Sequence, residues 1–519
     1  MRFSLWAPRP GRVELHLDGA RLPMQKDPGG WWEVEAATRS GADYGYCLDG
    51  GDPLPDPRSR WQPHGVHGLS RLVDHGAFRW SDAGWRGRRL ADAILYELHV
   101  GTFTPGGTFE SAIGRLDHLV DLGVNTVELM PVAEFIGDRG WGYDGVDLWA
   151  PHHAYGGPEG LTRLVDAGHA RGLAVLLDVV YNHLGSEGGY LERFGPYLTD
   201  RHPTPWGRGY NFDGRDSRPV RDFVIENAVA WLRDYHLDGL RLDAVHAITD
   251  ASPRHIVDEL AARAHELDPP RLVVAEKPRI DPALLEMGVD GQWADDFHHA
   301  LHVLLTGERT GYYARYGSVA DLAGALLQPG RLGVDAARVV GFAQNHDQVG
   351  NRAAGERLSM LVDPARLRMA ASLVACAPFV PMLFMGEEWG ATTPFLFFSD
   401  HRDPQIARRT SRGRMEEFQA FGWRPEDVPD PQDRASFESS RLDWAELSLE
   451  PHRDLLDWHR RLLRLRRQTP ELRSGATVRV EHDRSHGALT MTRGSVRLDC
   501  DFIRGRAALE MGDPGQKWE

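Results

Sequence analysis

The segment 239–248, GLRLDAVHAI, places an arginine and an aspartate two positions apart inside an apolar run. Residues two apart in a β-strand point to the same face, so Arg241 and Asp243 would lie side by side. Isolated charges in a dry interior are costly, and buried charges are therefore paired or used in chemistry. A guanidinium keeps a neighbouring carboxylate ionised, which suits a nucleophile.

Polar side chains also follow four other apolar runs. They are Asp178, Asn182 and His183 in LDVVYNH; Glu276 after RLVVA; Asp295, Asp296, His298 and His299 in GQWADDFHH; and Asn345, His346, Asp347 and Gln348 in FAQNHDQ. Several carboxylates with arginine and histidine, and no Gly-Lys-Ser/Thr phosphate loop, favour glycoside chemistry. In a retaining glycosidase the nucleophile and the acid lie about 5–5.5 Å apart. Asp243 and Glu276 follow neighbouring runs and are the expected pair.

Eight short apolar runs alternate with helical patterns in the middle of the chain. They cover residues 93–100, 126–130, 174–180, 239–245, 271–276, 291–296, 339–345 and 381–385. This alternation predicts an α/β fold, a (β/α)8 barrel with insertions over residues 89–445, whose active site lies where the strands end. One connecting helix is expected over 108–123, with Thr108 as N-cap and Gly123 as its stop.

Strand patterns predict β-domains on both sides of the barrel. Alternating segments such as RVELHLDG, separated by turn residues, predict a β-sandwich over residues 1–88. Residues 446–519 begin with a helix and continue as a small C-terminal β-domain. The 519-residue chain is therefore expected to have three domains.

Composition excludes several kinds of partner. The net charge is −15, from 60 basic and 75 acidic residues, which disfavours a nucleic-acid partner and suits a neutral ligand. The sequence shows no signal-peptide pattern and no apolar run of about 18 residues, so no membrane span is expected. Cys47, Cys376 and Cys500 are read as free thiols in a reducing cytoplasm.

Four motifs, LDVVYNH, GLRLDAVHA, VVAEKP and FAQNHDQ, occur in the order seen in the α-amylase family of glycoside hydrolases, and the chain resembles that family. The resemblance implies that Asp243 is the nucleophile, Glu276 the general acid/base, and Asp347 the carboxylate that stabilises the transition state. It also implies that Asp178, His183, Arg241 and His346 line the −1 subsite, with Tyr143 of GWGYDGVD as an aromatic platform.

Longer segments, among them YELHVGTFTPGGTF and GLRLDAVHAITD, resemble trehalose-releasing members of that family nearly from end to end. The implied reaction is cleavage of the α-1,4 linkage beside the terminal trehalose of maltooligosyl trehalose, an α-glucan oligosaccharide, without a cofactor. No metal is expected, because no dense run of oxygen ligands occurs. The segment KPRID after Glu276 differs from the polar segment that relatives carry. The resemblance therefore does not define the contacts to the sugars on the leaving-group side of the cleaved bond, the plus sites.

The expected substrate contacts form one set. They are Tyr143, Asp178, His183, Arg241, His246, Asp296, His298, Asn345, His346 and Gln348. Asp296 and its neighbouring histidines are candidates for selecting the trehalose end, although either His298 or His299 would then serve in packing alone. Two alternatives remain, a glycogen branching enzyme and a non-catalytic glucan-binding protein. The segment HAITDASPRH, which lacks the tyrosine expected after the nucleophile of a branching enzyme, argues against the first, and the intact acidic trio argues against the second.

Overall fold

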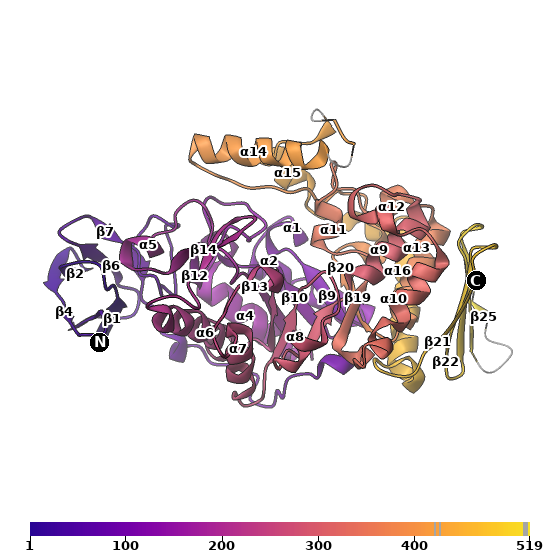
Figure 1. Ribbon diagram of the computed structural model, residues 1–519, viewed down its shortest axis with the longest axis horizontal. Helices are drawn as coiled ribbons and strands as arrows, with labels where there is room; N and C mark the ends of the chain where they lie inside the picture. The colour runs from indigo at the N-terminus through magenta and orange to yellow at the C-terminus, as the bar shows by residue number, and fades with distance from the viewer. Residues whose placement is uncertain (420–421, 425–426, 512–516, 519) are drawn as a thin grey trace.

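The computed structural model describes residues 1–419, 422–424, 427–511 and 517–518. Figure 1 shows β-sheets at the two ends of the molecule and the barrel between them. The N-terminal sandwich pairs one sheet of β1 (Arg2–Trp6), β5 (Trp31–Glu35) and β4 (Gln25–Lys26) with a second of β3 (Ala20–Pro23), β2 (Val13–Leu17), β6 (Asp43–Leu48), β7 (Pro53–Leu54) and β8 (Ser70–Arg71). Rings from the two sheets, Phe3 and Tyr44, meet edge to face at 5.3 Å and close its core.

Eight parallel strands form a closed barrel. They are β9 (Leu95–Leu98), β10 (Thr126–Leu129), β13 (Ala174–Val179), β16 (Gly239–Leu242), β17 (Leu272–Ala275), β18 (Gly291–Trp293), β19 (Val339–Phe342) and β20 (Val380–Phe384). All eight predicted apolar runs are barrel strands, and the predicted fold class is confirmed. The strand sequences are mostly apolar on both faces, because helices cover the outside of the barrel and side chains fill its inside.

Helices surround the barrel and connect its strands. The longer ones are α4 (Gly157–Ala170), α6 (Ser217–Asp234), α7 (Ile256–His265), α9 (Asp295–Thr306), α10 (Val319–Arg331), α13 (Pro364–Cys376), α14 (Pro404–Gln419) and α16 (His452–Gln468). The shorter ones are α1 (Val100–Phe103), α2 (Phe109–Ile113), α3 (Leu116–Leu122), α5 (Leu191–Phe194), α8 (Pro282–Glu286), α11 (His346–Gly350), α12 (Leu358–Leu361) and α15 (Arg434–Ser439). The 3-10 turns are η1 (His75–Ala77), η2 (Leu90–Asp92), η3 (His153–Tyr155), η4 (Val245–Ala247), η5 (Gly311–Arg315), η6 (Ala336–Arg338), η7 (Glu387–Trp389), η9 (Trp444–Ser448) and η10 (Pro470–Leu472).

The helix expected over 108–123 is two helices. Thr108 caps the first, accepting from the Ser111 amide at 3.1 Å, and Gly123 ends the second with a φ of 107°. The first helix, α2, ends at Gly114, and the second helix, α3, begins after Arg115. Glycine is a poor helix former, which explains why the helix is interrupted there. The apolar pattern continues on both sides of Gly114, so the pattern alone does not reveal the interruption.

Insertions at the strand ends frame the barrel mouth. β11 (Ala133–Glu134) pairs with β12 (Asp147–Pro151), and the loop between them carries Trp141 and Tyr143. A second ribbon consists of β14 (Leu198–Thr204) and β15 (Gly207–Tyr210). Helix α14 follows β20 and lies along one side of the molecule, as Figure 1 shows in orange. These elements lie outside the regular repeat of strand and helix that forms the barrel.

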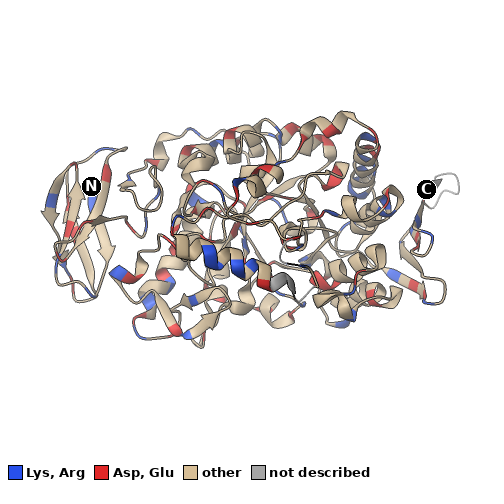
Figure 2. Cartoon of the chain, turned by 90° about the horizontal axis from the view of Figure 1, so that it is seen from above, with Lys and Arg blue, Asp and Glu red and all other residues tan. Residues whose placement is uncertain are grey.

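The C-terminal sheet has the strand order β21 (Arg479–Asp483), β22 (Ala488–Arg493), β23 (Val496–Asp501), β24 (Arg506–Met511) and β25 (Lys517–Trp518). Its apolar face shares a core with α13 and α16. In Figure 2 acidic and basic residues are interspersed along the chain. Among the described residues, no helix combines the length and apolar character needed to cross a bilayer.

Candidate active site

Arg241 connects the ends of three neighbouring barrel strands. It is fully buried, and its Nη1 donates to Asp178 Oδ2 at 2.6 Å and to Asp243 Oδ1 at 2.9 Å. Its Nη2 donates to Glu276 Oε2 at 2.8 Å. The guanidinium lies 4.2 Å from the ring centre of Trp293, which forms the floor beneath it. One cation therefore positions three carboxyl groups that come from β13, β16 and β17.

Asp243 and Glu276 are neighbours because their strands are in register. Leu242 pairs with Ala275, and the next residue on each strand is one of the two acids. Their side chains are 13% and 14% exposed, so both reach the barrel mouth. Asp243 accepts a further hydrogen bond at 2.7 Å from Asn182 Nδ2, which orients its second oxygen.

The turn after Asp243 aims a backbone donor at Glu276. Ala244 has φ 40° and ψ 50°, a left-handed conformation that costs energy for a residue with a Cβ. Its amide donates to Glu276 Oε2 at 2.8 Å. Burial raises the pKa of Glu276 to about 8, against the opposing effect of Arg241 and with a further rise from Asp243 and Asp347. Glu276 is thus protonated near neutral pH and able to donate a proton.

A hydrogen-bonded chain continues from Asp178 across the barrel. The Tyr143 hydroxyl donates to Asp178 Oδ2 at 2.6 Å and accepts from His346 Nε2 at 2.8 Å. His346 Nδ1 in turn donates to Glu97 Oε1 at 2.5 Å. Burial lowers the pKa of His346, but Glu97 outweighs it and raises this pKa to about 9. The imidazole is therefore a cation at neutral pH.

Asp347 lies in the first turn of helix α11, beside this chain. Its Oδ1 lies 3.7 Å from His346 Nε2 and accepts from Asn351 Nδ2 at 2.9 Å. Asn351 Oδ1 accepts from Arg414 Nη1 at 2.8 Å, and Arg414 also donates to the carbonyl of Gly350. Helix α14 is thereby anchored through two hydrogen bonds to the carboxylate expected to stabilise the transition state. Asp347 is 40% exposed and is open to a ligand.

Two of the sequence-predicted residues lie at the rim of this cluster. His183 Nε2 donates to the carbonyl of Tyr143 at 3.1 Å, and its Nδ1 contacts Asn182, so its role is to hold the platform loop. His246 is exposed on η4, immediately after Asp243. Desolvation by the groups around it lowers the pKa of His246.

Three other predicted substrate contacts have different surroundings from those expected. His298 is 1% exposed; its Nδ1 donates to the Ala343 carbonyl at 2.7 Å, and its Nε2 accepts from Tyr313 at 3.1 Å. It is the packing histidine of its pair. Asn345 is 1% exposed and caps α11, accepting from the Gln348 amide at 2.8 Å. Both ring nitrogens of His298 and the side-chain oxygen of Asn345 thus have partners within the protein. Gln348 is half-buried beside Tyr313.

A groove of about 410 Å³ opens next to Asp296. Asp296 accepts from Arg315 Nη2 at 3.1 Å and from Gln328 Nε2 at 3.3 Å, and it also contacts Tyr316. Arg279, from the unusual KPRID segment after Glu276, lines the same groove. The neighbouring Asp295 does not line this groove and instead lies within the electrostatic influence of Asp347 and Arg241. Burial raises its pKa to about 7, with a further rise from Asp347.

Sequence reasoning missed several residues of the cluster. Glu97 interrupts the apolar run AILYELHV, and this is the same signal that identified Arg241. Glu128 of β10 is beside Glu97 in the barrel, 1% exposed, and neither of its oxygens has a hydrogen-bond partner among the described residues. Burial raises the pKa of Glu128 well above its usual range, with Glu97 adding to the rise. Asn182 and Asp295 were recognised at strand ends but were not assigned to the site.

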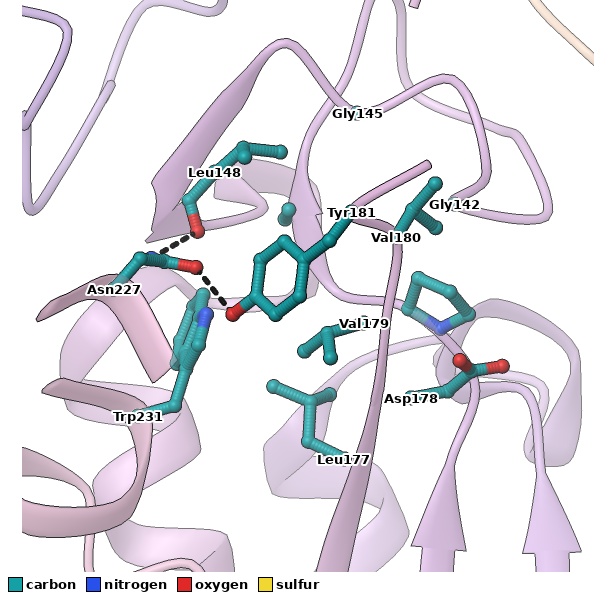
Figure 3. Close-up of a pocket in the computed structure, with 12 residues that line it drawn as sticks. Gly142, Gly145, Leu148, Leu177, Asp178, Val179, Val180, Tyr181, Asn227 and Trp231 are labelled. Carbon is teal, nitrogen blue, oxygen red and sulfur yellow. Dashed lines mark hydrogen bonds between the residues drawn. The ribbon is translucent and has the colours of Figure 1, made fainter. Parts of the chain in front are cut away.

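The small cavity in Figure 3 lies behind the cluster. Its volume is about 10 Å³, too small for a sugar, and it is bounded by Asp178, Tyr181 and Trp231 among others. Tyr181 donates to Asn227 Oδ1 at 2.7 Å, and Asn227 donates to the Leu148 carbonyl at 2.9 Å. These bonds tie β13 to α6 and to β12, and so support Asp178 from outside the barrel.

Known proteins share this arrangement over nearly the whole chain. A profile of the α-amylase catalytic domain matches residues 75–204. The malto-oligosyltrehalose trehalohydrolase of Arthrobacter ramosus is 49% identical over 96% of this chain and 92% of its own length. The protein of the same name from Rhizobium sp. strain M-11 is 48% identical over 96% and 91%. This chain belongs to the malto-oligosyltrehalose trehalohydrolase family.

Solved structures share the fold of this chain. A crystal structure described as a putative alpha amylase from Salmonella typhimurium has a TM-score of 0.87 and 39% identity, covering 96% of this chain and 90% of its own. A pullulanase from Paenibacillus barengoltzii, at 21% identity and a TM-score of 0.73, shares the fold. A branching enzyme of Corynebacterium jeikeium is 33% identical over 47% of this chain, so the branching alternative is not favoured.

Proposed function

We propose that this protein is a retaining glycoside hydrolase that cleaves the α-1,4 linkage next to the terminal trehalose of maltooligosyl trehalose and releases trehalose. The observation that carries the proposal is the shared guanidinium of Arg241, which donates to Asp243 at 2.9 Å and to Glu276 at 2.8 Å. Full-length similarity to named trehalohydrolases supports the substrate.

The chemistry divides between the two acids. The Asp243 carboxylate attacks the anomeric carbon while Glu276 donates its proton to the leaving oxygen of the trehalose unit. Water then hydrolyses the glycosyl ester, and Glu276 removes a proton from that water. Arg241 and Asn182 orient Asp243 through hydrogen bonds to its two oxygens, whereas burial keeps Glu276 protonated at the start. Every proton and bond in the cycle is supplied by these two residues, water and the substrate.

Register supports retention of the anomeric configuration. Asp243 and Glu276 follow paired residues of adjacent strands, which are about 4.8 Å apart in a sheet. Both carboxyl groups also bond the same guanidinium. This arrangement suits the separation of about 5–5.5 Å found in retaining enzymes and leaves little room for the additional water that an inverting enzyme places between its acids.

The remaining residues of the cluster would bind the −1 sugar. Tyr143 stacks beside the His346 ring, with a centroid distance of 5.2 Å, and gives the sugar a flat apolar surface. The His346 cation and the Asp347 carboxylate lie 3.7 Å apart, so the two groups would bind neighbouring hydroxyl groups of the sugar. Asp178 accepts hydrogen bonds from Arg241 and Tyr143 and so would hold these two side chains in place beneath the sugar.

Selection of the trehalose end requires groups beyond the cleavage point. Trehalose is 1,1-linked and compact, so a selective site needs hydrogen-bonding groups set for its terminal ring. His246, Asp295 and Asp296 are the candidates, because they lie at or beside the cleft from β16 and β18. The arginines that line the groove with Asp296 would add further donors.

The three cysteines favour a cytoplasmic location. Cys47, Cys376 and Cys500 are free and buried. Free thiols of this kind are typical of proteins in a reducing compartment, whereas secreted proteins tend to pair them as disulfides.

One product analysis tests the proposed function. The protein is incubated separately with maltotriosyl trehalose, maltopentaose and amylose, and the products are separated by chromatography. We expect free trehalose with maltotriose from the first substrate and much slower cleavage of the other two. New α-1,6 branches in amylose would indicate a branching enzyme. Binding without turnover would indicate a glucan-binding protein, and rapid cleavage of amylose a plain amylase.

A further inference from the structure

The ribbon β11–β12 brings together a buried glutamate and two histidines away from the catalytic cluster. Glu134 and His152 are both 0% exposed, and His153 is half-buried beside them. One potential ligand atom from each residue lies within 4.8 Å of the other two. The proposed reaction uses none of these side chains.

His152 has an unusual position for a buried histidine. Neither of its ring nitrogens has a hydrogen-bond partner among the described residues. Its Nδ1 nevertheless lies 3.3 Å from Glu134 Oε2, so two polar atoms approach closely without forming an aligned hydrogen bond. A buried polar atom without a partner costs free energy, and such an atom calls for a ligand that the surrounding side chains do not supply.

The spacing of these atoms fits two ligands of one metal ion. Zinc binds histidine nitrogen and carboxylate oxygen at about 2.0–2.2 Å, and tetrahedral angles then separate two ligand atoms by about 3.4 Å. This matches the 3.3 Å between His152 Nδ1 and Glu134 Oε2. Two ligands of a tetrahedral ion do not point a proton at each other, which accounts for the missing hydrogen bond.

His153 supplies a third ligand and an outer carboxylate. Its Nδ1 lies 2.7 Å from Glu134 Oε1, and its Nε2 lies 3.5 Å from Asp138 Oδ1. A histidine that binds a metal through one nitrogen commonly presents its other nitrogen to a carboxylate, which sets its tautomer and orientation. Glu134 and Asp138 bring two carboxylate groups to this cluster, and carboxylate oxygens are suitable partners for a divalent cation.

We propose that Nδ1 of His152, Nδ1 of His153 and the Glu134 carboxylate bind one divalent transition-metal ion of the zinc class. A water completes the tetrahedron on the half-exposed side of His153. Glu134 binds the ion through Oε2, which also accepts from the His153 amide at 2.7 Å, and the 2.7 Å hydrogen bond between Oε1 and His153 Nδ1 is given up when that nitrogen binds the ion. This site departs from the sequence-based expectation of no metal, because its ligands are separated along the chain and meet only in the ribbon.

The ion would be structural, because its ligands lie before and after the loop that carries Tyr143, the residue proposed to contact the flat face of the sugar. Glu134 and His152 lie on either side of residues 135–146, the loop that holds Trp141 and Tyr143. His152 stacks on Phe135, with a centroid distance of 3.8 Å, at the start of this loop. Binding would therefore join the two ends of the loop and reduce its freedom, at a distance from the reacting atoms.

Cobalt and zinc titrations of the full chain test the proposal. The protein is dialysed against a chelator, and Co²⁺ is added while the visible spectrum is recorded. Tetrahedral nitrogen and oxygen coordination gives absorption near 500–600 nm that saturates at one equivalent and is displaced by Zn²⁺. Melting temperature is then measured with and without one equivalent of Zn²⁺, and we expect Zn²⁺ to raise it.

Two matched variants separate a metal site from an ordinary hydrogen-bonded group. His153→Gln removes a proposed ligand at a half-exposed position, whereas His265→Gln removes a similar imidazole–carboxylate pair, 3.0 Å from Asp290, outside the cluster. His153→Gln should lose both the cobalt band and the zinc-dependent rise in melting temperature, and His265→Gln should keep both. A wild-type protein with no saturable band and no response to Zn²⁺ would overturn the proposal. Neither measurement depends on activity, so the result is independent of the proposed function.

Discussion

Arg241 donates from Nη2 to the carboxyl group of Glu276 at 2.8 Å, so a permanent cation contacts the group proposed to act as an acid. A nearby cation favours the ionised form of a carboxyl group, yet the pKa of Glu276 is raised to about 8. Burial and the two neighbouring aspartates together outweigh the arginine. The balance keeps the proton on Glu276 while the same arginine donates a hydrogen bond to Asp243 at 2.9 Å.

This balance predicts an alkaline limit to activity. The proton on Glu276 is present below its folded-state pKa of about 8 and is lost as the pH rises through that value. Plots of kcat/KM against pH should therefore fall above about pH 8. Glu276→Gln should lower kcat by about 10²–10⁴-fold, because general acid catalysis is lost, while substrate binding stays close to normal. Activity that remains constant to pH 10 would contradict this assignment.

The stereochemistry of the first product tests Asp243. Proton NMR during the first turnovers should show the α-anomer of the new reducing end, followed by slow mutarotation. Asp243→Asn should remove turnover, with unchanged circular dichroism as the control for folding. An initial β-anomer would mean direct attack by water and would exclude Asp243 as nucleophile.

Glu97 is expected to set the charge of His346. Glu97→Gln removes the carboxylate that raises the pKa of His346 to about 9, so this pKa should fall and the imidazole should become neutral near pH 7. Loss of one charged hydrogen bond, worth about 1.5–3 kcal/mol, predicts a fall of about 10–100-fold in kcat/KM. NMR titration of the histidine measures the pKa, and thermal melting controls for a general loss of stability. An unchanged pKa would show that Glu97 does not set the charge of His346.

Arg414 is expected to position Asp347 from outside the barrel. Arg414→Met removes the donor to Asn351 but keeps an apolar stem over the Phe397 ring. We expect kcat to fall by about tenfold while KM changes little, because Asp347 acts mainly on the transition state. Arg412→Met is the matched control on α14, since Arg412 is 80% exposed and pairs with Glu416. Equal losses from both variants would indicate general damage to α14 instead.

Asp296 should affect selectivity more than hydrolysis. Asp296→Ala removes the acceptor for Arg315 and Gln328 and changes the groove beside the cleft. The ratio of kcat/KM for maltotriosyl trehalose to that for maltopentaose should decrease in the variant. Equal loss on both substrates would place Asp296 in general catalysis or in folding.

The barrel and the acidic residues at its mouth were predictable because each leaves a local signal. Eight short apolar runs could only pack as parallel strands, and charged residues at their ends had to meet on one face. Asp243 and Glu276 were found in this way. Glu97 was overlooked although its signal was similar, because the run around it continues beyond the charge and hides the strand end.

Other features depend on contacts that no local pattern contains. His298 and His299 are adjacent in the sequence, and only the positions of Ala343 and Tyr313 show that His298 is used in packing. Likewise, Glu134 and His152 are 18 positions apart and meet because β11 and β12 pair with an irregular register. Long insertions at strand ends carry these contacts, and their paths are set by tertiary packing.

The hydrogen-bonded chain from Glu97 through His346, Tyr143 and Asp178 to Arg241 has an evolutionary consequence. Each member forms a hydrogen bond with the next. A substitution at one position therefore leaves a polar atom of its neighbour buried without a hydrogen-bond partner, and this costs free energy. Effects of such substitutions are not additive, and a second change at the adjacent position can restore part of the loss. Among related enzymes these five positions should therefore behave as one inherited unit, changing together or remaining as they are.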